Sequence, residues 1–193
     1  MKKLVAAVVL ILFVFAAQAQ DDKGFKRENI FIGSGINLGF SNGFILGLNP
    51  EIGYSLNKFV DAGLATNITY ITQNDYNSSA VFRYSVAGGG PFIRFWPARM
   101  LFIGGQLEYN TISSSVKFEG NVTDKTSYSA PSILVGAGYG NRFIGQSQFY
   151  TSIVVDVMKD QKSPYVDGYN RMQPVFRTAF LFYLHPKKES RQK

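Results

Sequence analysis

The stretch FILGLNPEIGYSL, residues 44 to 56, alternates large apolar residues with small or polar ones. Successive side chains of a β-strand point to opposite faces of its sheet, so this period of two predicts a strand. One face would carry Phe44, Leu46, Leu48, Ile52 and Tyr54. The opposite face would carry Gly47, Asn49, Glu51, Gly53 and Ser55. Glycines and an isolated charge on the second face indicate a surface that is enclosed.

The same alternation recurs along the rest of the chain, and turn residues separate the segments. Ser41-Asn42-Gly43 favours a tight turn because Asn and Gly tolerate the positive φ that hairpins need. A helical period does not prevail anywhere after residue 20. The pattern therefore predicts eight strands, at residues 29–40, 44–56, 60–72, 83–96, 100–116, 128–140, 148–158 and 171–184.

The lengths of these strands and of their connections favour a barrel in a membrane. The strands exceed the roughly 5–6 residues usual in globular sheets and suit the roughly 9–11 that a tilted membrane strand needs. Short connections at 57–58 and 97–99 alternate with long ones at 73–82 and 117–127, and only 41–43 breaks this order. An even strand number lets the first strand pair with the last. We therefore predict an all-β fold, an eight-stranded antiparallel up-and-down transmembrane β-barrel.

The N-terminus carries two lysines, an apolar run from Leu4 to Ala17 and a small-residue site at Ala17-Gln18-Ala19. This order is typical of a cleaved secretory signal peptide. The predicted organisation is a signal peptide at 1–19, an N-terminal periplasmic lead at 20–28, the barrel at 29–184 and a basic C-terminal tail at 185–193. Both termini would then be periplasmic, and the long connections would face outward.

Composition excludes several classes of function. The chain has no cysteine, which excludes disulfides, thiolate catalysis and thiolate metal sites. Its formal net charge of +7 comes from scattered bases, whereas a nucleic-acid surface usually clusters them. The single histidine, His185, follows the last strand, so a serine–histidine triad or a histidine metal site is not expected. We expect no enzymatic activity, no cofactor and no nucleic-acid partner.

Charged residues on the inward face form the first candidate site. Such residues are costly to desolvate alone, so they should pair inside the barrel. They are Glu51, Arg94, Glu108, Asp156 and Arg177. The network would either fill the lumen as a salt-bridged plug or line a narrow ion path.

Tyrosines and an aspartate in the predicted outer loops form the second candidate site. Amphipathic rings in polar loops suit contacts with a partner, although such loops are more often simply solvated. The residues are Tyr76, Tyr165, Asp167 and Tyr169. Aromatic residues near strand ends would form interfacial girdles: Tyr54, Phe59, Tyr70, Phe95, Trp96, Tyr109, Tyr139, Phe149, Phe182 and Tyr183.

Three stretches together carry a resemblance: NPEIGYSLNKFVDAGLATNITY at 49–70, GPFIRFW at 90–96 and VGAGYG at 135–140. They resemble the small OmpA/OmpX-like outer-membrane β-barrel family that is abundant in Bacteroidetes, which pairs PEIGY and an alternating strand with a later PFIRY-type strand. Members commonly end on an aromatic residue that the insertion machinery recognises. Here residues 185–193 follow Tyr183-Leu184, so the insertion signal would be internal, at Phe180, Phe182 or Leu184.

The resemblance implies an integral protein of the bacterial outer membrane. Its partners would be outer-membrane lipids, including lipopolysaccharide, and the outer-membrane insertion machinery, and the protein would be a monomer. Its role would be in envelope structure or surface interaction. The alternatives are a small ion or solute channel, an accessory barrel of a secretion or gliding apparatus, and a soluble lipocalin-like ligand binder, which would need the apolar face inside.

Overall fold

The structure is a computed structural model that describes residues 26–40, 43–74, 81–117, 123–166 and 170–185. The predicted signal peptide, most of the N-terminal lead and most of the tail lie outside these residues. The described chain begins with a short 3₁₀ turn, η2 (Arg27–Asn29), at the entrance to the first strand. No helix in the described part of the chain is long and apolar enough to cross a membrane.

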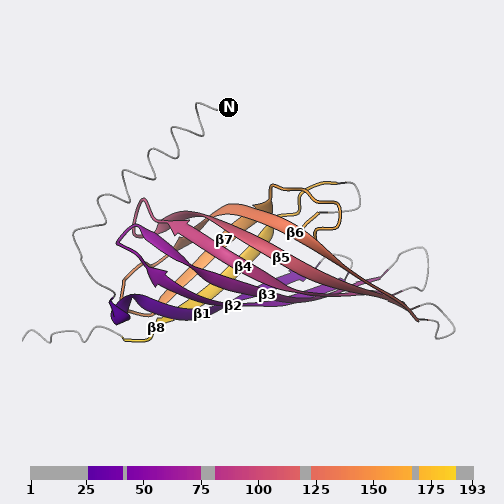
Figure 1. Ribbon diagram of the computed structural model, residues 1–193, viewed down its shortest axis with the longest axis horizontal. Coiled ribbons are helices and arrows are strands. Elements are labelled where there is room, and N and C mark those ends of the chain that lie inside the picture. Colours follow the sequence, from indigo (N-terminus) through magenta and orange to yellow (C-terminus); the bar gives the residue numbers. More distant parts are fainter. Residues whose placement is uncertain (1–25, 41–42, 75–80, 118–122, 167–169, 186–193) are drawn as a thin grey trace, which may run out of the picture.

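Eight strands follow and close into an antiparallel barrel in which each strand neighbours the next along the chain, as predicted (Figure 1). They are β1 (Ile30–Phe40), β2 (Gly43–Ser55), β3 (Val60–Asn74), β4 (Val81–Phe95), β5 (Leu101–Lys117), β6 (Thr123–Gly140), β7 (Gln148–Asp156) and β8 (Val175–Tyr183). The barrel closes where β1 pairs with β8, from Phe31 opposite Tyr183 to Ile36 opposite Thr178. Because the strand number is even, the start of β1 and the end of β8 lie at the same end of the barrel.

Two strand boundaries differ from the prediction by four or more residues, and the others lie within two residues of it. The sixth strand begins at Thr123 and not at 128, because its first residues pair with β5 although they are mostly hydroxyl or charged and show no apolar alternation. The eighth strand begins at Val175 and not at 171. Pro174, just before it, has no N–H to donate to a ladder.

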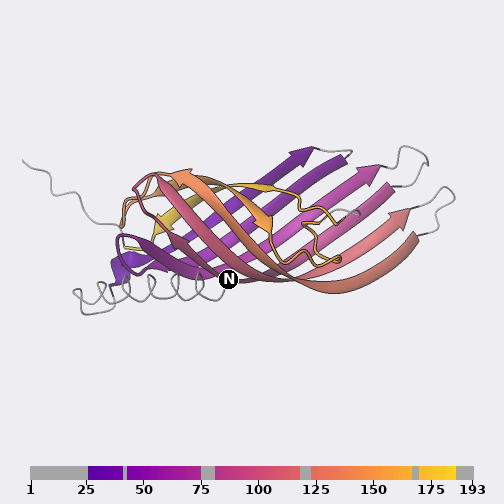
Figure 2. The same cartoon turned by 90° about the horizontal axis from the view of Figure 1, so that it is seen from above.

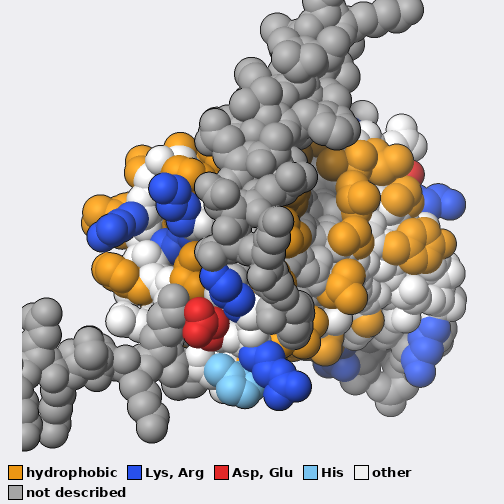
Figure 3. All heavy atoms as spheres, turned by 60° about the vertical axis from the view of Figure 1, so that its left-hand side comes forward, with side chains coloured by type: hydrophobic (Ala, Val, Ile, Leu, Met, Phe, Trp, Pro, Cys, Tyr) orange, Lys and Arg blue, Asp and Glu red, His pale blue; other side chains and the backbone are white. Residues whose placement is uncertain are grey.

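Most outward side chains of the strands are apolar, and the buried polar side chains face inward, as the alternation predicts. Exposed outward side chains occur on all eight strands and include Ile36, Leu48, Leu64, Ile93, Leu107, Ile133, Ile153 and Phe180. Buried inward polar residues include Asn49, Glu51, Asp61, Asn67, Arg94, Glu108, Asn110 and Arg177. Hydrophobic side chains are accordingly visible on the molecular surface in Figure 3. This is the reverse of a soluble barrel with an apolar centre.

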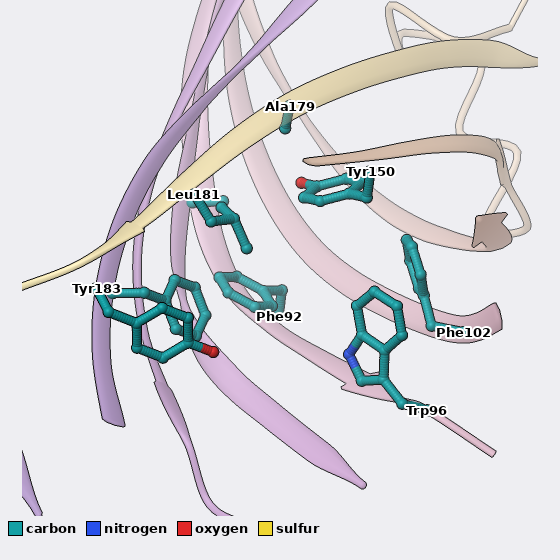
Figure 4. Close-up of a cluster of buried hydrophobic side chains, with 9 residues drawn as sticks. Phe92, Trp96, Phe102, Tyr150, Ala179, Leu181 and Tyr183 are labelled. Atoms are coloured by element: carbon teal, nitrogen blue, oxygen red, sulfur yellow. The ribbon is translucent and has the colours of Figure 1, made fainter. Parts of the chain in front are cut away.

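An aromatic cluster lies inside the barrel at the end where β1 begins and β8 ends (Figure 4). The Trp96 and Phe102 rings lie 4.6 Å apart, and the Phe102 and Tyr150 rings meet edge to face at 5.4 Å. The Phe102 ring lies against Gly138 so closely that a Cβ at that position would overlap it. A glycine on the inner wall therefore makes room for a ring in this narrow barrel.

For two members of this cluster, Trp96 and Tyr183, the prediction of an interfacial girdle is wrong. Trp96 and Tyr183 are buried in the interior and do not belong to an interfacial girdle. Strand alternation explains both positions: Trp96 shares the inward face with Phe92 and Arg94, and Tyr183 shares it with Arg177. The Tyr183 hydroxyl lies 2.8 Å from that of Ser55, so its polar end is paired inside the barrel.

The strands have unequal lengths, and the wall is therefore taller on one side. β5 and β6 have 17 and 18 residues, whereas β7 and β8 have 9 each. β7 pairs only with Leu134 to Gly140 of β6, so the earlier part of β6 has a ladder to β5 alone among the described strands. The β3–β4 and β5–β6 hairpins consequently reach beyond β7 and β8 at the end opposite η2 (Figures 1 and 2).

Candidate functional site

Asp61 of β3 is the centre of a polar cluster at the end of the barrel where β1 begins and β8 ends. Its carboxylate accepts hydrogen bonds from the Ser55 hydroxyl at 2.6 Å and from the Trp96 indole at 2.8 Å, and it forms an ion pair with Arg142. Arg142 also donates to the Asn57 carbonyl at 2.7 Å. Since Asp61 is fully buried, this pairing satisfies a charge that would otherwise be strongly destabilising.

The pair of Asp61 and Arg142 is absent from the residues predicted from the sequence. Asp61 was recognisable as inward-facing, but Arg142 comes from the connection between β6 and β7, where no strand period indicates the direction of a side chain. A possible signal was the aspartate itself, because a buried carboxylate on the inner wall requires a cation. Only the three-dimensional fold identifies which one.

The next layer joins Glu51 of β2 to Arg94 of β4. Arg94 donates from both terminal nitrogens to the two Glu51 oxygens, which is a bidentate ion pair. It also donates to the Tyr150 hydroxyl at 2.8 Å, and that hydroxyl donates to Glu51 at 3.1 Å. The guanidinium lies 4.2 Å from the centre of the Phe92 ring, a cation–π contact. Side chains of β2, β4 and β7 thus meet across the lumen.

A third layer joins Glu108 of β5 to Arg177 of β8. Arg177 donates to Glu108 Oε1 at 3.0 Å and to the Gln106 side chain at 2.8 Å. The Tyr165 hydroxyl donates to Glu108 Oε2 at 2.6 Å, and the Asn67 amide donates to that hydroxyl at 2.7 Å. The layer therefore spans the barrel from β3 to β8 and includes one residue from outside the strands.

Asp156 does not join either arginine. It lies at the end of β7, where it accepts hydrogen bonds from the Ser163 hydroxyl at 2.6 Å and from the backbone N–H of Ile133 and Met158. Ser163 also lies 3.0 Å from the Ser132 hydroxyl. Asp156 therefore holds the connection between β7 and β8 against the end of the barrel. Of the five residues predicted to form one charge network, the structure brings together two separate pairs, Glu51 with Arg94 and Glu108 with Arg177.

Tyr165 lies in the predicted outer connection, but its side chain is buried and is not available for surface contact. Only 7% of this residue is exposed, because the connection between β7 and β8 folds into the barrel mouth and inserts the ring among polar residues of the third layer. Burial, together with the nearby Glu108 carboxylate, raises the pKa of its hydroxyl well above the usual value. The hydroxyl therefore stays protonated and able to donate. The other three loop candidates, Tyr76, Asp167 and Tyr169, lie outside the described residues.

These layers leave little open space along the axis. A cavity of about 40 Å³ lies beside Phe92, Arg94 and Gln106, which is room for only a few water molecules. Among the described residues, no three histidine, aspartate or glutamate side chains gather in a way that could hold a metal ion. The arrangement stabilises a filled lumen.

We expect Tyr165→Phe to loosen the connection between β7 and β8. The change removes the shorter of two hydrogen bonds to Glu108 Oε2, the other coming from the Asn110 amide at 3.1 Å, and it takes an acceptor from the Asn67 amide, at a cost of about 1–3 kcal/mol. Limited trypsin digestion of the folded barrel should then cleave faster at Lys159 and Lys162. Tyr139→Phe, which changes an exposed outward hydroxyl, is the matched control and should leave the cleavage rate unaltered.

Comparisons with known proteins give only distant similarities. No protein-family model matches the chain, and no curated protein matches it. Among solved structures, the chain is similar to Ail, the attachment invasion locus protein of Yersinia pestis, in complex with the heparin analogue sucrose octasulfate. The TM-score is 0.47 and the identity is 11%, and the match covers 79% of this chain and 92% of that chain. A second structure of Ail from Yersinia pestis gives a TM-score of 0.38 and 17% identity over 79% of this chain and 91% of that one.

Proposed function

We propose that this protein is a monomeric, non-enzymatic barrel of the bacterial outer membrane. The observation that carries the proposal is the ring of exposed apolar side chains on all eight strands, around an interior of buried charges and amides. Water would make such an exterior costly, whereas lipid hydrocarbon would accept it. A closed barrel also leaves no unpaired strand edge inside a bilayer.

The height of the apolar band can be followed along β5. Its outward side chains are Leu101, Ile103, Leu107 and Tyr109, after which Thr111 and Ser113 follow on the same face. On β6 the outward face changes in the same way, where Ser129, Ser127 and Lys125 lie beyond Pro131. This change from hydrocarbon to hydroxyl and cationic side chains supports a lipid boundary near Tyr109, with the taller hairpins standing clear of the membrane.

The tall side of the wall supports a role at the cell surface. Among the described strands, the first part of β6 pairs with β5 alone, and such an edge is a typical place for another chain to add a strand. We therefore place the long hairpins outside the cell and both termini in the periplasm. Insertion by the outer-membrane machinery and contact with lipopolysaccharide follow from that orientation.

Fractionation of the native cell envelope, followed by trypsin treatment of intact cells, tests location and orientation together. The proposal predicts recovery in the outer-membrane fraction and cleavage at Arg83 or Lys125, which the structure places on the tall hairpins. Recovery as a soluble periplasmic protein would contradict it. Cleavage only after the outer membrane is permeabilised would contradict the orientation.

A small channel is the second candidate, and the filled lumen argues against it. The Glu51–Arg94 layer joins β2, β4 and β7 across the lumen, and the Glu108–Arg177 layer joins β5 and β8. We expect no stepwise conductance when the folded protein is incorporated into planar bilayers, under conditions in which a porin gives clear steps. Reproducible steps whose ion selectivity changes in Arg94→Ala would favour the channel instead.

A further inference from the structure

A second interior cavity, larger than the one beside Arg94, lies in the barrel mouth under the connection between β7 and β8. Its volume is about 150 Å³. Its wall is mainly apolar, with Ile71 of β3, Val86 of β4 and Pro164, Pro174 and Val175 of the connection and the start of β8. The polar side chains of Thr69 and Gln173 also line it. No charged side chain lines it. The cavity therefore suits an uncharged, largely apolar molecule.

The inner limit of this cavity is polar but already satisfied. Tyr165 and Asn67 both line it, and their hydroxyl and amide groups are engaged with each other at 2.7 Å and with the third layer. These groups link the floor of the cavity to the Glu108–Arg177 ion pair. A molecule in the cavity would therefore meet paired groups at the floor and hydrocarbon at most of the wall.

One polar atom in the wall is not satisfied. Asn37 of β1 is only 5% exposed and lines the cavity, and its side-chain oxygen has no hydrogen-bond partner among the described residues. Buried polar atoms are paired in the great majority of cases, and an unpaired one is unfavourable. A hydroxyl or N–H group on a bound molecule would supply the missing donor.

We infer that this cavity is a binding site for a small, uncharged, mainly apolar molecule that carries one hydrogen-bond donor. The size of a single substituted ring fits, because an apolar cavity of about 150 Å³ in another protein accepts benzene. The apolar wall would hold the body of the molecule, and the Asn37 oxygen would accept its donor. This site is separate from the surface role proposed above.

The donor requirement gives a direct test with two probes of nearly equal size. 4-Fluorophenol carries a hydroxyl donor, and 4-fluoroanisole replaces its hydrogen by a methyl group. The folded protein in lipid nanodiscs is titrated with each probe and followed by fluorine NMR, and empty nanodiscs measure partition into lipid. We expect one saturable site above that partition and about five-fold tighter binding of the phenol, the ratio of a typical net hydrogen bond.

Three variants locate the site. Val86→Phe fills the cavity and should abolish saturable binding of both probes. Asn37→Leu keeps the size of the side chain but removes the acceptor, so both probes should bind equally. Gln148→Leu is the matched control, because Gln148 is also buried with an unpaired side-chain oxygen but lies beside Tyr183 and does not line the cavity. It should keep the five-fold preference.

A heat-modifiable gel shift confirms that each variant is folded, and Ile71→Phe replaces Val86→Phe as the cavity-filling change if the latter does not fold. Absence of a saturable site in the unaltered protein would overturn the inference, since the cavity would then hold only water or remain empty. Saturable binding that persists with the cavity filled would overturn it as well. An unchanged preference for the phenol in Asn37→Leu would overturn the assigned role of Asn37.

Discussion

Replacing Asp61 by leucine should destabilise the barrel by about 3–5 kcal/mol, because it leaves a buried arginine without its counter-ion. Arg142 forms its ion pair with Asp61, its guanidinium lies 5.3 Å from the Trp96 ring centre, and only 5% of the residue is exposed, so its charge would be left buried. The indole N–H of Trp96 and the Ser55 hydroxyl would lose their acceptor in the same change. Urea unfolding of the refolded protein in lipid vesicles, followed by the fluorescence of this single tryptophan, measures the loss.

A double variant separates the ion pair from the general cost of altering the site. Arg142→Met should cost less than Asp61→Leu, since Asp61 keeps two neutral donors. The double variant Asp61→Leu with Arg142→Met should be more stable than the sum of the single losses predicts, because no unpaired charge remains. Asp160→Asn, in the connection between β7 and β8, is the control for removal of a carboxylate and should change the stability by less than about 0.5 kcal/mol. If the stability loss of the double variant equals the sum of the two single losses, the ion pair between Asp61 and Arg142 is contradicted.

Leu107→Arg should also have a large effect, but from the outside of the wall. Leu107 is 53% exposed and lies between Ile103 and Tyr109 on the outward face of β5. In a bilayer this position lies in hydrocarbon, between the midplane, where an arginine on a barrel surface costs about 2–4 kcal/mol, and the boundary near Tyr109, where the cost falls to about 0–1 kcal/mol. The free energy of unfolding from lipid vesicles should therefore fall by about 1–3 kcal/mol, whereas in water the same change would cost almost nothing.

Ser113→Arg is the matched control, because it places the same side chain on the same face of the same strand above the apolar band. Its expected cost is below about 1 kcal/mol, as for an interfacial position. Equal effects at positions 107 and 113 would mean that the band does not face lipid.

The strands and their faces follow from the sequence alone, because alternation is a local property that the chain carries in every segment. The inward position of Glu51, Arg94, Glu108 and Arg177 is an example: one residue of register decides which side of the wall a side chain occupies. The partners within this set depend on the register between strands that are distant in sequence. Glu51 and Arg94, for instance, are brought together only by the closure of β2, β3 and β4 into a curved wall.

The connections were the least predictable part. Tyr165 and Arg142 lie between strands, where no period indicates direction, and both turn inward to satisfy buried partners. The start of β6 was missed because serine and threonine residues form its ladder without an apolar face. The cavity at Asn37 was also not predictable, since its wall combines residues of β1, β3 and β4 with a connection that folds back over them.

The orientation of the apolar face toward lipid is the central claim, and site-directed spin labelling tests it directly. The chain contains no cysteine, so single-cysteine variants at Leu64, Leu107 and Ile153 take one label each. In lipid vesicles we predict that these three labels are accessible to dissolved oxygen and protected from a water-soluble nickel complex, while a label at Ser127 shows the opposite. Nickel accessibility at Leu64, Leu107 and Ile153 equal to that at Ser127 would contradict the account.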